Sequence, residues 1–241
     1  MYMWVTNEPF EFGGTENLEI EIQLAKWLHK TFEIKTVFDI GAQNSEYPNI
    51  FTNASVYLFE PFPDFYNDLV AKYTNRSNVT ICPYGLGNED AVISYYPNTQ
   101  SFTKRTVQAM SIDPIELPIR TARNVVGDQT IDFMKIDVEG QEYEILKNLE
   151  SHIRAKKINF IQFEIGGTIF DTQYTLQNIF DIFDDSWTIY NMQHKGILNK
   201  LTSAPVLTRD NYGNGNLFAT HISLENPKNK LQMTDTGPVW I

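Results

Sequence analysis

The fold is decided by residues 36–42, which read Thr36-Val-Phe-Asp-Ile-Gly-Ala42. This β-branched and aromatic run stops at a glycine, which permits a sharp turn out of a strand. Similar short apolar runs recur along the chain at residues 56–60, 79–81, 131–136 and 158–163, with helices expected at 63–74, 141–150 and 173–184. Near-continuous apolar strands that alternate with helices predict a parallel sheet covered on both faces.

The segments around this alternating part complete the predicted architecture. Residues 16–32 predict an amphipathic helix with Glu19 and Glu21 on its outer side. Residues 84–88 predict a turn, and residues 91–96 predict an edge strand. Residues 187–190 and 217–220 predict a pair of strands that closes the sheet, and Asn214-Gly215 is a turn signal before the last of them. We expect one α/β domain over residues 1–241, with an N-terminal helical extension to about residue 34, a candidate lid loop at 97–116 and an extended tail at 225–241.

Composition narrows the class of protein. The 241 residues carry 19 Lys and Arg against 30 Asp and Glu, a formal net charge of −11, which disfavours but does not exclude a nucleic acid partner. Cys82 is the single cysteine, so a disulfide framework is excluded. No apolar stretch approaches the roughly 18 residues of a membrane span, and the N-terminus lacks a signal sequence. We therefore expect a cytoplasmic protein.

Acidic residues close four of the five predicted parallel strands or follow them directly. They are Asp39, Glu60, Asp137 and Glu164. Ligands of open α/β sheets bind outside the carboxyl ends of the strands, so these acids are expected to line a cleft. Gly41 lets the backbone turn there, and a helix expected to begin near Asn44 would offer free N–H groups to a phosphate or a carboxylate.

Glu60 lies 21 residues after Asp39, a position from which a carboxylate can accept hydrogen bonds from both hydroxyls of a ribose. Pro61 and Phe62 then offer apolar surface for a base. The full GxGxxG pattern is absent, since Ser45 stands where a later glycine would be, and this disfavours a dinucleotide oxidoreductase.

The most specific segment is Lys135-Ile-Asp-Val-Glu-Gly140, followed by Gln141 and Glu142. Lys135 lies inside an apolar strand, where an unpaired charge is costly, so Asp132 or another acid is expected to pair with it. Asp137 emerges at the strand end. Glu139 is expected to begin the next helix, where its charge would meet the positive end of the helix dipole.

Four motifs together resemble those of the FkbM-type methyltransferases, which use S-adenosylmethionine. They are Asp39-Ile-Gly-Ala42, Phe59-Glu60-Pro61, Gly85-Leu86-Gly87 and the run from Lys135 to Gly140. The resemblance covers about residues 36–165 and implies a three-layer Rossmann-like fold with a mostly parallel seven-stranded sheet and an antiparallel last strand. It also implies that Asp39, Gly41 and Ala42 line the methionine part of the cofactor, that Glu60 holds the ribose, that Gly85, Leu86 and Gly87 lie near the adenine, and that Asp137 lies beside the methyl group.

Two segments depart from the family pattern. Gln43-Asn44-Ser45 replaces the usual asparagine and later glycine, and Thr121-Ala122-Arg123 replaces a Thr-Leu-Asp run. If these changes disable the site, the chain would be a nucleotide-binding module without chemistry.

Methyl transfer to a hydroxyl requires alignment of the reacting atoms and a base for the acceptor's proton. The candidates are Asp137, Glu139, Glu164 and His194. Asp137 and Glu164 could instead hold magnesium, although no residue spacing demands a metal. The expected function is O-methylation of a sugar or another small hydroxyl compound, with a small-molecule or glycan acceptor. The alternative of an RNA or cap methyltransferase would need a local basic groove, formed by Lys104, Arg105, Arg120 and Arg123.

Overall fold

A computed structural model describes residues 4–6, 18–95, 115–166, 174–193, 197–206, 215–224, 231–234 and 237–240. Within these residues the centre is a nine-stranded sheet of order β1-β11-β10-β12-β9-β8-β2-β3-β4. Its parallel part is formed by β2 (Thr36–Ile40), β3 (Ser55–Phe59), β4 (Val79–Cys82), β8 (Ile131–Ile136) and β9 (Ile158–Ile165). The last sequence-predicted strand, β12 (Gly215–Thr220), is antiparallel to both β9 and β10 (Thr188–Gln193).

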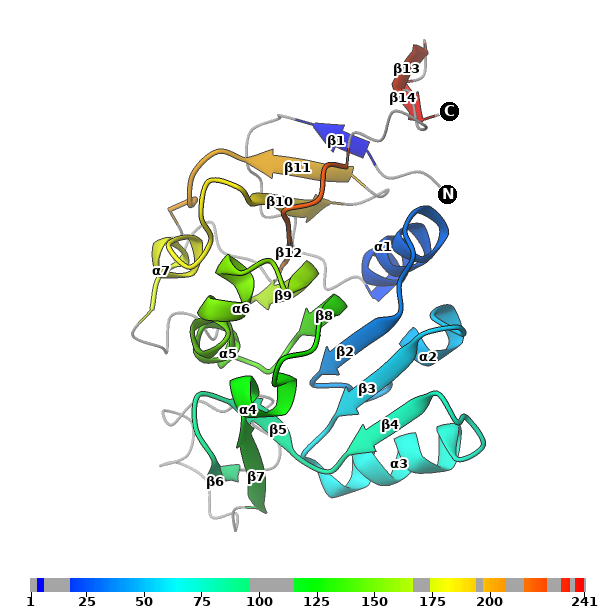
Figure 1. Cartoon of the computed structure of the whole chain (residues 1–241), viewed down its shortest axis with the longest axis vertical. Helices are drawn as coiled ribbons and strands as arrows, with labels where there is room; N and C mark the ends of the chain where they lie inside the picture. The colour runs from blue at the N-terminus through cyan, green and yellow to red at the C-terminus, as the bar shows by residue number, and fades with distance from the viewer. Residues whose placement is uncertain are drawn as a thin grey trace.

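Helices cover both faces of this sheet (Figure 1). One face carries α1 (Leu18–Thr31), α2 (Tyr47–Ile50) and α3 (Pro63–Tyr73), and the other carries α4 (Ala122–Val126), α5 (Glu142–Asn148), α6 (Glu150–Arg154) and α7 (Leu176–Phe180). A separate buried apolar cluster lies on each face. The predicted three-layer α/β fold is thus confirmed, with two strands more than the seven expected.

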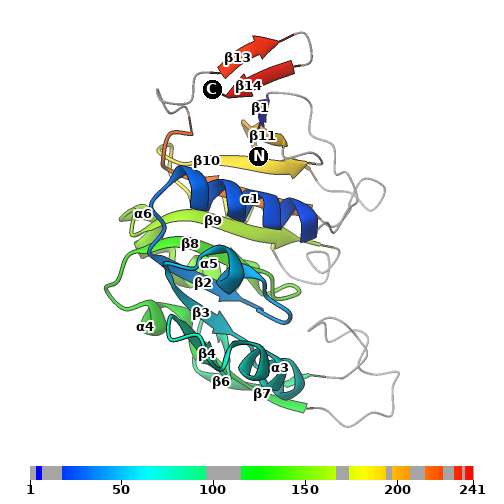
Figure 2. The same ribbon diagram turned by 90° about the vertical axis from the view of Figure 1, so that its right-hand side faces the viewer.

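Strand alternation sorts the side chains between the two faces. In β8, Phe133 joins the cluster under α1, whereas Met134 and Ile136 join the opposite one. Phe133 and Lys135 share a face because side chains two residues apart point the same way. Figure 2 shows α1 lying along the sheet on this face, where its buried residues meet those of β9, β10 and β12.

A second, three-stranded sheet was not predicted. It has the order β5-β7-β6 and consists of β5 (Gly85–Gly87), β6 (Ala91–Tyr95) and β7 (Ile115–Thr121). The expected turn at 84–88 is wrong, because Gly85–Gly87 pairs with β7, and the strand expected at 91–96 belongs to this side sheet. A Cβ on Gly85 would lie 2.8 Å from Ile119 Cδ1, and one on Gly87 would lie 2.8 Å from Ile119 Cγ2, so the Ile119 side chain would have to shift to admit either one.

The ends of the chain also differ from expectation. β1 (Trp4–Thr6) pairs with β11 (Ile197–Leu201), so the N-terminal extension is not helical throughout. The tail contains an antiparallel pair, β13 (Leu231–Thr234) with β14 (Gly237–Trp240), rather than only extended chain. The expected lid at 97–116 lies outside the described residues, apart from Ile115 and Glu116 in β7. No helix in the described part of the chain is long and apolar enough to cross a membrane.

Candidate functional site

Two cavities lie at the carboxyl edge of the parallel strands. The first, of about 320 Å³, lies toward the side sheet, and the second, of about 660 Å³, lies toward α1. Both are lined by Gly41, Gln43, Phe62, Phe65, Asp137 and Glu139. The two cavities therefore meet at the ends of β2 and β8, where the sequence predicts the site.

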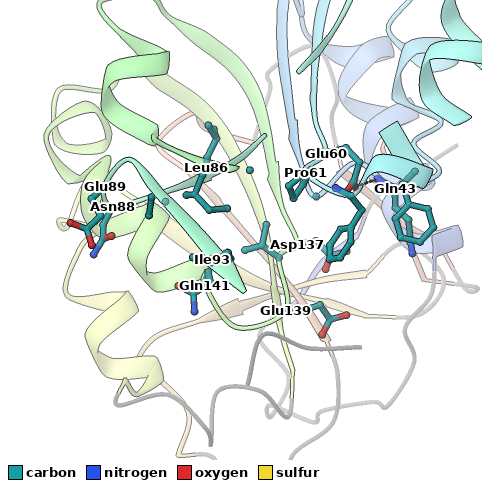
Figure 3. A pocket seen from close by; sticks show the side chains of 18 residues that line it. Gln43, Glu60, Pro61, Leu86, Asn88, Glu89, Ile93, Asp137, Glu139 and Gln141 are labelled. Atoms are coloured by element: carbon teal, nitrogen blue, oxygen red, sulfur yellow. Dashed lines mark hydrogen bonds between the residues drawn. The ribbon is translucent and has the colours of Figure 1, made fainter. Parts of the chain in front are cut away.

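The first cavity combines an apolar wall with polar ends. Pro61, Phe62, Phe65, Leu86, Ile93 and Ile119 supply the apolar wall. Figure 3 shows Gln43, Glu60 and Pro61 on one side, Leu86, Asn88 and Glu89 on the other, and Asp137 between them. Ile93 comes from β6 and Ile119 from β7. The side sheet therefore supplies part of the apolar wall, which was not predicted from the sequence.

Glu60 is held in a fixed orientation at the end of β3. Its Oε2 accepts a hydrogen bond from the Gln43 backbone N–H at 2.8 Å, and its Oε1 accepts one from the Phe62 N–H at 2.9 Å (Figure 3). Burial raises the pKa of Glu60, and these two N–H groups oppose the rise. A carboxylate offers about four lone-pair sites, so Glu60 retains acceptor capacity for ligand hydroxyls in the cavity.

The loop after β2 is shaped by contact with β8. Gly41 has a φ of +80°, and a Cβ there would lie 1.8 Å from the Asp137 carbonyl oxygen. The Gly41 and Ala42 N–H groups both donate to the Phe59 carbonyl, at 3.0 and 3.1 Å. The helix expected near Asn44 instead begins at Tyr47 and is only four residues long. Asn44 lies in the preceding loop and lines the second cavity.

Lys135 is the buried cation of the site. Its ammonium donates to the Gly41 carbonyl at 3.0 Å and lies 3.1 Å from Asp137 Oδ2 and 3.6 Å from Asp39 Oδ1. Burial alone would lower the pKa of Lys135, but the Asp137 and Asp39 carboxylates raise it, so the side chain stays charged. Asp132, one expected partner, instead accepts from the backbone N–H groups of Lys35 and Thr36.

Asp137, Glu139 and Glu164 form an acidic cluster in which one carboxylate oxygen from each lies within 4.8 Å of the others. Burial, followed by the charges of Asp137 and Glu139, raises the pKa of Glu164 to about 9. Because its pKa is raised this far, the Glu164 carboxyl group keeps its proton at neutral pH and can donate a hydrogen bond within the cluster.

The turn between β8 and α5 corrects one expectation. Glu139 does not begin the helix, because it has a φ of +57° and α5 starts at Glu142. The buried Glu142 carboxylate accepts two backbone hydrogen bonds. The Val138 N–H donates to Oε1 at 3.0 Å, and the Gly140 N–H donates to Oε2 at 3.0 Å. Burial raises the pKa of Glu142 to about 7. Glu142 thus fixes the turn that positions Asp137 and Glu139.

Two residues that line the second cavity were not predicted from the sequence. Glu21 of α1 was expected on the outer side of the helix, but it lines this cavity together with Asn216 of β12. Asn216 Nδ2 donates to Glu21 Oε1 at 3.0 Å, and Asn216 is paired with Glu164 across the two strands. His194, the remaining candidate base, lies outside the described residues.

The fold is a Rossmann-like α/β fold with acids at the carboxyl edge of a mostly parallel sheet, the usual place of a ligand site. A model of the methyltransferase FkbM domain matches residues 39–204. The chain therefore belongs to the FkbM methyltransferase family, as its motifs predict.

Comparison with individual proteins gives relatives of limited similarity. Over 151 residues the chain is 27% identical to the hexuronic acid methyltransferase AglP of Haloferax volcanii. The alignment covers 57% of this chain and 59% of that relative. The chain therefore spans about three fifths of the relative's length. The crystal structure of methyltransferase FkbM from Methylobacillus flagellatus gives a TM-score of 0.47 at 18% identity, covering 78% of this chain and 45% of that one. An rRNA methylase from Streptococcus thermophilus gives 0.46 at 10% identity, covering 86% and 98%.

Proposed function

We propose that this chain transfers a methyl group from S-adenosylmethionine to a hydroxyl group of a sugar or another small molecule. The observation that carries the proposal is the meeting of the two cavities at Gly41 and Asp137. A cofactor with its nucleoside in the first cavity and its methionine part past this junction would present its methyl group there, to an acceptor in the rest of the second cavity. The family membership supports methyl transfer, and the relative named a hexuronic acid methyltransferase supports a sugar acceptor.

The residues present fit such a cofactor. Glu60 would accept the ribose hydroxyls, with Pro61, Phe62, Gly85 and Leu86 beside the adenine. Asp39, Gly41, Ala42 and Asn44 would line the methionine part, since all four border the second cavity. The buried Asp39 Oδ1 accepts no hydrogen bond, and its nearest cation is Lys135 at 3.6 Å, so a donor from a ligand would satisfy it.

When bound, S-adenosylmethionine supplies a methyl group on a cationic sulfur that leaves as a neutral thioether. Asp137 would take the proton of the acceptor hydroxyl as the new oxygen–carbon bond forms. The Lys135 ammonium lies 3.1 Å from Asp137 Oδ2 and would orient this carboxylate, and Glu164 would donate a hydrogen bond that orients the acceptor. Glu139 stands beside them as a further acid of the same cluster.

Other functions have less support in the site. An RNA or cap methyltransferase would need a basic groove, but Arg120 pairs with Asp90 at 3.4 Å, and Lys104 and Arg105 lie outside the described residues. A module without chemistry would need a disrupted loop at 43–45. That loop is instead held by Glu60, through Gln43, and by Tyr73, whose hydroxyl donates to the Ser45 carbonyl at 2.6 Å. We also propose that residues 1–241 act as one domain, since one sheet joins β1 to β12.

Titration calorimetry with S-adenosylmethionine and with NAD, on the full chain, tests the cofactor. We expect binding of the former and none of the latter. Absence of S-adenosylmethionine binding would end the proposal. Each titration is repeated with EDTA and with added Mg²⁺, because the acidic cluster has the ligand chemistry of a magnesium site.

A further inference from the structure

The loop between β2 and α2 borders the second cavity with each of its residues from Gln43 to Glu46. Gln43 has a φ of +37°, in a region that residues other than glycine rarely adopt. A strained conformation of this kind persists only where surrounding contacts hold the chain in place. The shape of this loop therefore depends on its contacts, and they come from two sides.

The first side is the end of β3, where Glu60 lies. The Gln43 N–H donates to Glu60 Oε2 at 2.8 Å (Figure 3), and the Ser45 N–H donates to the Ala42 carbonyl at 2.7 Å. The carboxylate proposed to hold the ribose thus also fixes the start of the loop.

The second side is the last turn of α3. The Lys72 ammonium donates to the Ser45 carbonyl at 3.1 Å and to the Asn44 carbonyl at 3.4 Å, and it pairs with Glu46 Oε1 at 2.6 Å. The Tyr73 hydroxyl donates to the same Ser45 carbonyl at 2.6 Å. Because a carbonyl oxygen has two lone pairs, α3 engages the Ser45 carbonyl fully. Two neighbouring side chains therefore fix three consecutive residues of the loop.

Lys72 and Tyr73 act on the loop from outside the cavities. Neither is among the described residues that line the first or the second cavity. The Tyr73 ring is buried in the apolar cluster on this face of the sheet. Burial alone would lower the pKa of Lys72, but the hydrogen bond to Glu46 raises it, so the ammonium stays charged and keeps its donors.

We propose that Lys72 and Tyr73 are positioning residues, which hold residues 44–46 in the shape that the methionine part of S-adenosylmethionine requires. Asn44 is one of the residues proposed to line that part, and its carbonyl is tied to Lys72. The nucleoside would lie in the first cavity, whose described lining includes Gln43 but not residues 44–46. Loss of the α3 contacts should therefore weaken recognition of the amino-acid end of the cofactor and spare the nucleoside. This inference rests on the proposed function and deepens it.

Two ligands that share the nucleoside and a neutral thioether separate the two parts of the site. S-adenosylhomocysteine carries the amino-acid end, and methylthioadenosine lacks it. Titration calorimetry compares their affinities for the full parent chain and for Lys72→Met, Tyr73→Phe and the double variant. Each single variant should weaken S-adenosylhomocysteine binding by about fivefold, the effect of one net hydrogen bond, and should change methylthioadenosine binding by less than about twofold.

Arg76→Met is the matched control. Arg76 also donates to a backbone carbonyl, that of Pro48 at 2.6 Å, and its replacement changes the net charge by as much as Lys72→Met does. Pro48 lies in α2 and is not among the described residues that line either cavity, so both affinities should stay at the parent's values. Lys72→Arg keeps a charged donor and should recover most of the affinity for S-adenosylhomocysteine.

The thermal midpoint verifies that each variant folds, and Tyr73→Phe keeps the buried ring. Equal weakening of both ligands would make Lys72 and Tyr73 supports of the fold alone and would overturn the inference. Unchanged affinity for S-adenosylhomocysteine would overturn it as well, because the loop would then hold its shape without them. The same selective loss in Arg76→Met would assign the effect to net charge. Failure of the proposed function looks different, because the parent chain itself would then bind neither S-adenosylmethionine nor S-adenosylhomocysteine.

Discussion

The Asp137 carbonyl oxygen lies 1.8 Å from the point where a Cβ on Gly41 would stand. The ends of β2 and β8 are therefore packed backbone to backbone, and this close approach lies where the two cavities meet. The sequence predicts that Gly41 is a turn residue, and the resemblance to the family implies that it lines the methionine part of the cofactor. The structure shows that the glycine makes room for the neighbouring strand end, and that the junction of the cavities depends on it.

Gly41→Ala should destabilise the protein by more than the backbone conformation alone accounts for. A residue in a sparsely populated conformation costs about 1–3 kcal/mol, and the overlap with Asp137 adds about 1–3 kcal/mol of overpacking. Gly127→Ala is the matched control, because Gly127 also has a positive φ, of +58°, but nothing lies within 4 Å of its Cβ position. Urea unfolding measures both. Equal losses would show that the Asp137 contact relaxes freely.

Glu60→Ala should weaken S-adenosylmethionine binding by about 1–3 kcal/mol, because it leaves ligand hydroxyls and two backbone N–H groups without their acceptor. Calorimetry measures the affinity. Glu33→Ala removes an exposed carboxylate that lines neither cavity and serves as the control, which should keep the parent's affinity. An unchanged affinity in Glu60→Ala would remove Glu60 from the cofactor site.

Asp137→Asn should lower turnover by about 10²–10⁴-fold if Asp137 takes the acceptor's proton. The amide keeps an oxygen for the Lys135 ammonium, so loss of folding should be modest. Turnover on a glycoside acceptor, together with the thermal midpoint, checks both parts. Full activity would exclude Asp137 as the base, and the parallel variant Glu139→Gln would then be the next to measure.

The free energy of unfolding should fall as the pH rises through the range set by Glu164. Its pKa is about 9 in the folded protein against an ordinary value of 4.5, so the folded state binds more protons between these two values. The contribution of Glu164 is fully present below about pH 4.5 and is lost as the pH rises through about 9. Glu164→Gln should flatten this part of the profile. Parallel profiles for variant and parent, measured by urea unfolding, would contradict the raised pKa.

The central strands could be predicted because both of their faces are buried. The predicted bounds of β2 and β8 are those observed, since a strand covered on both sides is a near-continuous apolar run. The side sheet could not be predicted. Gly85–Gly87 is too short to show a period, and Pro118 interrupts β7. The pairing of β5 with β7 joins residues 34 positions apart, such as Gly85 and Ile119.

The two partners of Lys135, Asp137 and Asp39, could be predicted only in part from the sequence. Asp137 lies two residues further along the same strand direction, so alternation places the two side chains on one face. Asp39 required the register of β2 against β8, in which Asp39 stands opposite Lys135. Asp132 has the opposite parity and lies at the other end of the strand, where it accepts from Lys35 and Thr36.

Glu21 shows why a helical period alone does not locate a cleft. Its place on the polar side of the helix is read correctly from the sequence. Whether that polar side meets water or a cavity depends on where the helix lies over the sheet. Here α1 reaches the carboxyl edge, so one polar residue faces Asn216 while Glu19 stays exposed.

Glu21 and Asn216 both fall outside residues 39–204, the segment shared with the family, whereas Asp39, Glu60, Asp137 and Glu164 fall inside it. The four acids at the carboxyl edge of the sheet thus lie within the family segment, and the segments that flank it supply part of the wall of the second cavity. Substitutions at these two flanking positions therefore change the wall of the second cavity while every residue of the family segment stays as it is.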